Sequence, residues 1–156
     1  MREAIGGTWL FGLVLTFIVF FASFLALSIN YAKAFNVKNS IVDLVSKYEG
    51  NNCKARKSIK DYLVSTGYLV SGVCLNGYQG YDMEGNEVDP GKKAYYCILN
   101  GDTGDNTVLN KNYYRIMIFF HIDLPIVGDL TTFRIKGETE SIYFSKDEIS
   151  SKCSGV

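Results

Sequence analysis

Two hydrophobic patterns follow one another at the start of the chain. The first is a run from Trp9 to Ile29 that contains no charged residue. A helix of this length, at about 1.5 Å per residue, would reach roughly 31 Å, the thickness of the hydrocarbon core of a bilayer. A secretory signal has a shorter apolar region followed by a small-residue cleavage site, and this run has neither property. The pattern predicts a transmembrane helix over residues 9–29, preceded by residues 1–8, a segment too short to form an element of its own.

The second pattern is amphipathic and begins where the first one ends. After Ile29, apolar residues recur at the three- and four-residue spacing of a helix, and no Pro or Gly interrupts them before Gly50. One continuous helix from Trp9 to Glu49 is therefore expected, with residues 30–50 projecting from the membrane. The projecting stripe has two interpretations: it packs beneath a globular head, or it contacts neighbouring subunits. Candidate lipid or stalk contacts are Trp9, Phe11, Phe17, Phe20, Phe21 and Phe24, and candidate packing residues are Phe35, Ile41, Leu44, Val45 and Tyr48.

Residues 51–156 predict a head that combines a helix with strands. Asn51 or Asn52 can cap a short helix that ends at Gly67. Beyond it the hydrophobic period changes from that of a helix to the two-residue period of strands. The predicted fold is α+β, in which the long helix packs on one face of a small antiparallel sheet. Apolar residues of the short helix are Ala55, Ile59, Tyr62 and Leu63, and the strand candidates cover residues 68–76, 93–100, 112–124 and 130–144.

The third strand candidate, residues 112–124, shows the clearest alternation. Residues two apart in a strand share one face of the sheet. One face would carry Tyr114, Ile116, Ile118, Phe120, Ile122 and Leu124, and the other would carry Arg115, Met117, Phe119, His121 and Asp123.

Four cysteines are spread across the head. They contain no C-x-x-C pair, and the chain has a single His, so a structural zinc site is not expected. Two disulfides in an oxidising compartment explain the spacing better. A bridge between Cys74 and Cys97 would staple two neighbouring strand candidates and would leave Cys53 to hold the C-terminal tail through Cys153. Four cysteines allow three connectivities, so the other pairings stay open.

Two arguments about membrane orientation disagree. Arg2 stands alone before the apolar run, whereas Lys33, Lys38 and Lys47 follow it, and the positive-inside rule would place the head in the cytoplasm. The even number and wide spacing of the cysteines indicate disulfides and therefore favour a head outside the cell. Because the cysteines concern the whole head and the charge bias is small, we expect a single-pass membrane protein with an extracellular head.

Charge and motifs exclude several classes of function. The 16 basic and 16 acidic residues balance, without a basic tract, so nucleic acid is not an expected partner. His121 lies in a strand without a nucleophile or paired carboxylates, and no phosphate-binding loop is found. Neither acidic cluster has the alternating spacing of a calcium loop. We expect no catalytic, cofactor or metal site. The two clusters are Asp82, Glu84, Glu87 and Asp89, and Asp102 and Asp105.

Three stretches carry a resemblance to a known family. The segment "EAIGGTWLF", the segment "INYAKAFNVKN" and the late strand pair "YYRIMIFFHIDLPIVGDLTTFRIKGETESI" resemble the TadE-like pseudopilins of tight-adherence pilus systems, within the type IV pilin-like family. The resemblance covers residues 1–50 and the last two strands. It implies a membrane-anchored minor pilin or assembly factor. It also implies that a glutamate near the start of the helix engages a neighbouring subunit. Glu3 can take this role only if the chain is not cleaved at Gly6 or Gly7; if it is cleaved there, the resemblance is one of shape alone.

These observations together predict a structural role. We expect a non-enzymatic, pilin-like subunit or pseudopilin of an extracellular filament or its assembly base, which associates with itself or with other pilin-like subunits through the N-terminal helix. The alternative is a solitary membrane-tethered extracellular binding domain that captures a partner through its tyrosine-rich loops. Its candidate contacts are Tyr78, Tyr81 and Tyr95.

Overall fold

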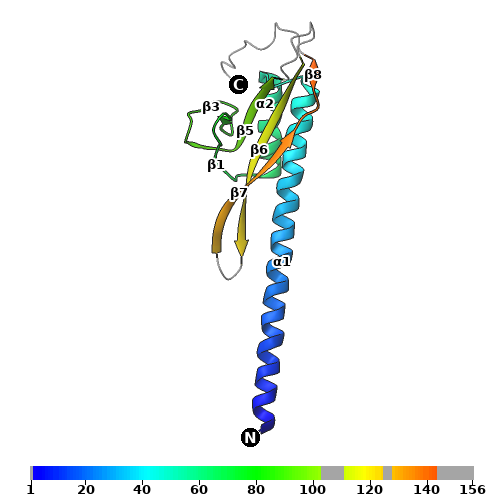
Figure 1. Cartoon of the computed structure of the whole chain (residues 1–156), viewed down its shortest axis with the longest axis vertical. Helices are drawn as coiled ribbons and strands as arrows, with labels where there is room; N and C mark the ends of the chain where they lie inside the picture. The colour runs from blue at the N-terminus through cyan, green and yellow to red at the C-terminus, as the bar shows by residue number, and fades with distance from the viewer. Residues whose placement is uncertain (1, 103–110, 125–127, 144–156) are drawn as a thin grey trace.

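The computed structural model describes residues 2–102, 111–124 and 128–143. A single helix, α1 (Arg2–Lys47), forms a rod, and the head packs only on its C-terminal half (Figure 1). The predicted continuous helix is confirmed, but it begins earlier than expected, because residues 2–8 are part of it. It also ends two residues before the expected Glu49, since Glu49 adopts a left-handed φ of 56° and the Gly50 amide donates to the Val45 carbonyl at 2.9 Å.

The predicted short helix is α2 (Cys53–Thr66), and local capping fixes both of its ends. The Asn52 side chain accepts a hydrogen bond from the Ala55 amide at 2.9 Å. Gly67, with a φ of 60°, ends the helix, and the Tyr68 amide then donates to the Leu63 carbonyl at 3.1 Å. Its predicted apolar side is buried at Ala55, Ile59 and Leu63.

The head contains a six-stranded antiparallel sheet in the order β3-β2-β5-β6-β7, with β8 paired to β6. A separate antiparallel pair, β1 with β4, lies beside it. The α+β class and the small antiparallel sheet are therefore confirmed. The main sheet comprises β2 (Gln79–Tyr81), β3 (Glu87–Val88), β5 (Tyr96–Asp102), β6 (Lys111–Leu124), β7 (Gly128–Glu138) and β8 (Ile142–Tyr143), and the pair comprises β1 (Gly72–Val73) and β4 (Lys93–Ala94).

Several predicted strand boundaries are wrong. The candidate over residues 68–76 contributes only β1, and the candidate over residues 93–100 is divided between β4 and the start of β5. The intervening segment, predicted as a loop, contains β2 and β3. The last candidate is divided at Thr139, whose amide donates to the Tyr114 carbonyl and whose hydroxyl accepts from the Tyr114 amide, both at 2.9 Å. Strands of two or three residues are too short to show an alternation of their own.

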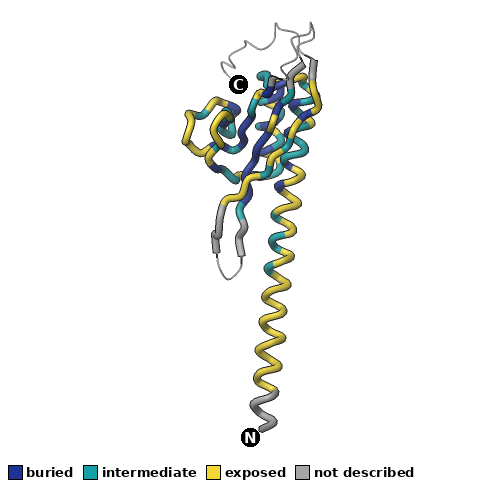
Figure 2. Tube along the Cα trace, in the orientation of Figure 1, coloured by how far each residue is buried: buried dark blue, intermediate teal, exposed yellow. Residues whose placement is uncertain are grey.

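The main core forms between α1 and one face of β6 (Figure 2). The alternation predicted for β6 places Tyr114, Ile116, Ile118 and Phe120 on one face, and this is the face that packs on α1, where all four are buried. They pack with a stripe on α1 that recurs every three or four residues. The fully buried members of this stripe are Ala34, Val37, Ile41 and Val45.

The opposite face of β6 is covered as well. Met117 and Phe119 are buried there together with Cys97. The backbone at Gly72 lies directly against the Phe119 ring and covers it. Only glycine fits here, because a Cβ added to Gly72 would lie 2.3 Å from Cδ1 of Phe119. The small β1–β4 pair thus forms a second layer, on the face of the main sheet opposite to α1.

A disulfide connects these layers. Cys74 and Cys97 are bonded at an S–S distance of 2.04 Å, the pairing that the spacing favoured. The predicted role of this bridge was wrong in one respect, because Cys74 follows β1 and Cys97 lies in β5, and these two strands belong to different sheets. The bridge therefore ties the small pair to the main sheet. Cys53 is also disulfide-bonded, and its predicted partner, Cys153, lies outside the described residues.

Candidate functional site

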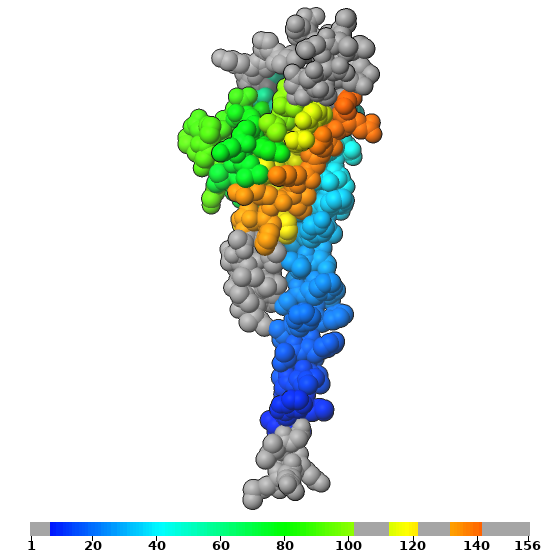
Figure 3. Space-filling model, in the orientation of Figure 1, coloured from blue at the N-terminus to red at the C-terminus, as the bar shows by residue number. Residues whose placement is uncertain are grey.

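The largest uncovered apolar surface is the N-terminal half of α1. All described side chains from residue 7 to residue 22 are exposed, Trp9 to 74% and Phe20 to 71%. In Figure 3 this half projects beyond the head as a bare rod. Within the described residues, one helix, α1, is long and apolar enough to cross a membrane. Surface of this extent in water would be strongly unfavourable, so lipid or protein must cover it.

Polar side chains on this half bond to the helix itself. The Thr16 hydroxyl donates to the Gly12 carbonyl at 2.9 Å, and the Ser23 hydroxyl donates to the Val19 carbonyl at the same distance. Such bonds satisfy the hydroxyl groups without water. The hydroxyl groups therefore do not prevent this helix from lying in an apolar environment.

A shallow groove runs along the same half of α1, centred on Gly12. A Cβ added to Gly12 would meet no atom within 4 Å, so the notch is open. Helices pack closely in membranes where small residues let two backbones approach. The groove is lined by Thr8, Trp9, Gly12, Leu13, Thr16, Phe17 and Phe20.

The predicted assembly residues fall into two groups. Trp9, Phe17 and Phe21 are exposed on the uncovered half, where the rings of Phe17 and Phe21 stack at 6.0 Å. Ile41 and Val45 are completely buried in the head core.

Three further candidates complete the second half of α1. Leu44 packs partly buried against the core, and half-buried Tyr48 accepts a hydrogen bond from the Ser58 hydroxyl at 3.0 Å. Phe35 is 40% exposed and lies outside the core, because the sheet covers only part of the predicted apolar stripe of α1. Of the two predicted roles, contact with neighbouring subunits stays a prediction for Phe35. Glu3 lies within α1, but its side chain is outside the described part of the structure.

An aromatic cluster marks the place where α1 leaves the head. The Tyr31 ring lies edge-on to Phe120 at 5.9 Å and stacks on Phe35 at 6.3 Å. Phe133 of β7 stacks on Phe120 at 5.4 Å, and the Lys38 ammonium lies 4.1 Å from the centre of the Phe35 ring. This cluster fixes the position of the β6–β7 hairpin along the helix. Sequence patterns do not reveal this cluster, because its members come from three elements that only the fold brings together.

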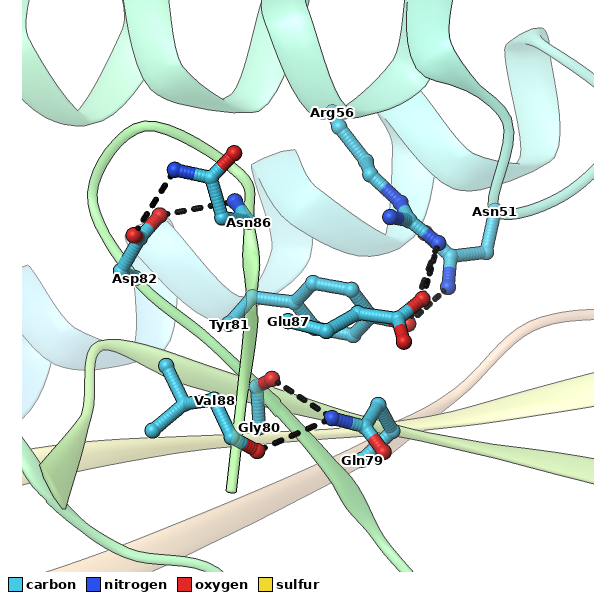
Figure 4. Close-up of polar contacts among 9 residues, drawn as sticks. All are labelled: Asn51, Arg56, Gln79, Gly80, Tyr81, Asp82, Asn86, Glu87 and Val88. Atoms are coloured by element: carbon cyan, nitrogen blue, oxygen red, sulfur yellow. Dashed lines mark hydrogen bonds and ion pairs between the residues drawn. The ribbon is translucent and has the colours of Figure 1, made fainter. Parts of the chain in front are cut away.

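A polar network holds the β2–β3 hairpin to α2 (Figure 4). The Arg56 guanidinium lies 4.5 Å from the Tyr81 ring centre and pairs with the Glu87 carboxylate at 3.2 Å. Asn51 accepts from Arg56 Nε at 3.1 Å and donates to the Tyr81 hydroxyl at 2.7 Å. Burial raises the pKa of Tyr81, and the neighbouring Arg56 charge partly opposes that shift. The contacts of Arg56 fix the hairpin to α2, since its guanidinium is directed to Tyr81, Glu87 and Asn51 of the same chain.

Two further acidic residues in and after this hairpin, Asp82 and Asp89, also have structural partners. The Asp82 carboxylate accepts a hydrogen bond from the backbone N–H of Asn86 at 2.7 Å and so closes the β2–β3 turn. Asp89 pairs with Lys92 at 2.6 Å, and this pairing lowers the pKa of the exposed Asp89 carboxyl. Among the residues that the structure describes, no group of three or more His, Cys, Asp or Glu side chains could hold a metal ion. Of the second acidic cluster, the Asp102 side chain and all of Asp105 lie outside the description.

The tyrosines of the alternative interpretation do not form one exposed patch. Tyr81 is buried and stacks on Tyr96 at 5.2 Å, whereas Tyr78 and Tyr95 are half-buried against the two cores. A recess of about 450 Å³ opens beside Tyr78, lined mainly by loop residues near the disulfide. These tyrosines therefore act mainly in packing.

Comparison with known proteins gives no relative for this chain: no family model, no curated protein and no solved structure matches it. The uncovered half of α1 is therefore the feature of the described structure from which we argue function.

Proposed function

We propose that this chain is a non-enzymatic, single-span, pilin-like subunit or pseudopilin, which assembles with like subunits into an extracellular filament or its base. One observation carries the proposal. The helix α1 is a single rod, with the head packed on its C-terminal half and an apolar surface left uncovered on its N-terminal half. Before assembly, lipid would cover this surface, and in the assembly the same surface of other subunits would replace lipid.

The groove around Gly12 supports packing between helices. It combines an open glycine with Thr8 and Thr16, and helical geometry places residues four apart on one side. Close packing of small residues is the main contact that apolar helices can make in lipid, where the hydrophobic effect offers no preference for protein over acyl chains. The groove would be the place where the α1 helices of two subunits meet.

The disulfide supports an extracellular head. The Cys74–Cys97 bridge ties two layers of a head of ordinary domain size, and such structural bridges persist in oxidising compartments. In this orientation the rod crosses the membrane with its N-terminus inside, and the head is displayed on the surface.

Two matched substitutions test assembly. Gly12→Leu fills the groove, whereas Gly7→Leu adds the same side chain on the opposite side of α1, where a Cβ also has open space. Neither change touches the head core. We expect Gly12→Leu to lower the association constant at least about tenfold, equivalent to about 1.4 kcal/mol per contact, and Gly7→Leu to leave it unchanged. Analytical ultracentrifugation of the full chain in mild detergent measures that constant. Wild-type protein that stays monomeric at every concentration and never co-purifies with a partner would contradict the proposal.

A further inference from the structure

The β6–β7 hairpin extends beyond the rest of the head along α1, toward the N-terminal end of the rod (Figure 1). Two contacts fix the position of the hairpin along the axis of α1. Gly137, paired with Ile116, lies against Lys38 and Val42, since a Cβ added to Gly137 would be 2.9 and 3.0 Å from their side chains. Four residues further along β6, Phe120 meets Tyr31. Between these contacts β6 advances about 13 Å and α1 advances about 10 to 16 Å. The axes of β6 and α1 are therefore nearly parallel, with opposite chain directions.

The end of the hairpin therefore lies well below the aromatic cluster. Leu124 is four residues beyond Phe120, which is about 13 Å further along the strand. That distance corresponds to about nine residues of helix, so the end of β6 is level with about Ala22.

The pattern of side-chain burial along α1 also places the end of β6 beside Ala22. Described side chains are exposed up to Ala22, and partial burial begins at Ser23 and recurs at Ala26, Leu27 and Asn30. This three- and four-residue spacing is that of a single helix face. It is continuous with the stripe that the head covers, which identifies it as the face beneath the hairpin.

This position conflicts with a hydrocarbon core that extends to Ile29. The end of the hairpin would then lie about 10 Å inside lipid. β5 pairs with β6 only as far as Ile118, so within the described chain both outer edges of the hairpin lack strand partners beyond that point. Unpaired backbone groups in lipid cost several kcal/mol each.

We propose that the described ends of β6 and β7, at Leu124 and Gly128, lie at the surface of the bilayer and that the hairpin sets the depth of the rod. The hydrocarbon core is then crossed by residues 4–22, which contain no charge and span about 28 Å as a helix. Arg2 and Glu3 precede this segment, at the opposite face of the membrane. The partner of the hairpin is the headgroup layer of the same bilayer. The inference rests on the transmembrane part of the proposed function and does not depend on filament formation.

Cysteine accessibility tests the depth. Leu25 is half-exposed on the side of α1 away from the hairpin. In sealed, then permeabilised, vesicles that hold the full chain at low density, we expect Leu25→Cys to react with a charged maleimide without detergent, although more slowly than Asn36→Cys, which lies beyond the headgroup layer. Leu15→Cys should react only after detergent is added. The unsubstituted chain serves as the blank.

The outcomes separate the two claims. Protection of Leu25→Cys together with labelling of Asn36→Cys would overturn the hairpin proposal and leave the transmembrane helix intact. Labelling of Leu15→Cys without detergent would overturn both, because α1 would then not span the bilayer.

A second measurement probes the hairpin directly. A fluorophore on Asp129→Cys should be quenched by lipids that carry bromine near the headgroup, whereas the same fluorophore on Lys136→Cys, higher on β7, should not be quenched. Equal absence of quenching at both positions would overturn the proposal.

Discussion

Ile41 and Phe35 lie on the same helix, six residues apart, but they have different surroundings. Ile41 is 0% exposed between α1 and β6, whereas Phe35 is 40% exposed, with the Lys38 ammonium over its ring. The sequence places both on one apolar stripe, because spacing indicates a face and not how wide the covering layer is. Ile41 therefore belongs to the part of the stripe that the head covers, and Phe35 to the part that it leaves exposed.

Charged substitutions at these positions should destabilise the head to different extents. Ile41→Asp places a carboxylate in the core and should destabilise the head by at least about 3 kcal/mol. Phe35→Asp should leave the head folded, with a smaller loss of about 1 kcal/mol from the contacts of its ring with Tyr31 and Lys38. Denaturant unfolding in detergent, followed by near-ultraviolet circular dichroism of the tyrosines, measures both. Equal destabilisation by the two variants would contradict the described core.

Two buried tyrosines make the stability of the head dependent on pH. Burial raises the pKa of Tyr68 and of Tyr96 above the usual range. The Tyr68 hydroxyl donates to the Phe119 carbonyl, and the Tyr96 hydroxyl has no hydrogen-bond partner within the described part of the chain. Both side chains are therefore held in the neutral form in the folded head.

The sign of the effect follows from proton binding. Above the unfolded pKa of about 10, the unfolded chain loses tyrosine protons that the folded head keeps, so stability falls by about 1.4 kcal/mol per pH unit for each tyrosine. Below that pH the contribution is constant. Denaturation midpoints measured from pH 8 to pH 11 should fall steeply for the wild type and less for the Tyr68→Phe/Tyr96→Phe double variant. Identical alkaline slopes would contradict this assignment.

At the scale of elements, the β2–β3 hairpin depends on α2 for its position. β3 has only two residues, and isolated hairpins of this length are unstable in water. Arg56 supplies the contacts with Tyr81 and Glu87 that hold the hairpin to the helix. A network of this kind cannot be read from spacing, since its members are separated by 25 and 31 residues in the chain.

Removing the Arg56 charge should loosen this hairpin alone. Arg56→Met keeps most of the side-chain stem and should accelerate amide hydrogen exchange in β2 and β3 by roughly tenfold, equivalent to about 1.4 kcal/mol. Exchange in β6 and β7 should not change. Lys57→Met, the same substitution at an exposed neighbour on α2, is the control. Uniform acceleration throughout the head would show that Arg56 supports global stability instead.

At the scale of the whole molecule, the sequence predicted the long elements and missed the short ones. The helix α1, the helix α2 and the alternation of β6 were predictable, because each repeats its pattern over many residues. The small β1–β4 pair, β2 and β3 were not, since their pairing depends on contacts between distant residues. The span was predicted as residues 9–29 from hydropathy alone, and only the position of the hairpin motivates a shift toward the N-terminus.

The candidate site follows the same division. The exposed aromatic residues of the first half of α1 and the buried residues of the second half were named from their spacing. The groove at Gly12 and the aromatic cluster at Tyr31 needed the structure. Together they describe a rod that is covered by its own head at one end and is left uncovered at the other.

If this rod belongs to a surface filament or its base, immunogold electron microscopy of the cell surface will locate it there. Intact cells, and the filaments sheared from them, are labelled with gold-conjugated antibodies against the head, with cells that lack the chain as the control. We expect gold along the filaments or at their cell-proximal ends. Gold distributed evenly over the membrane, with none on or beneath filaments, would contradict the proposed role.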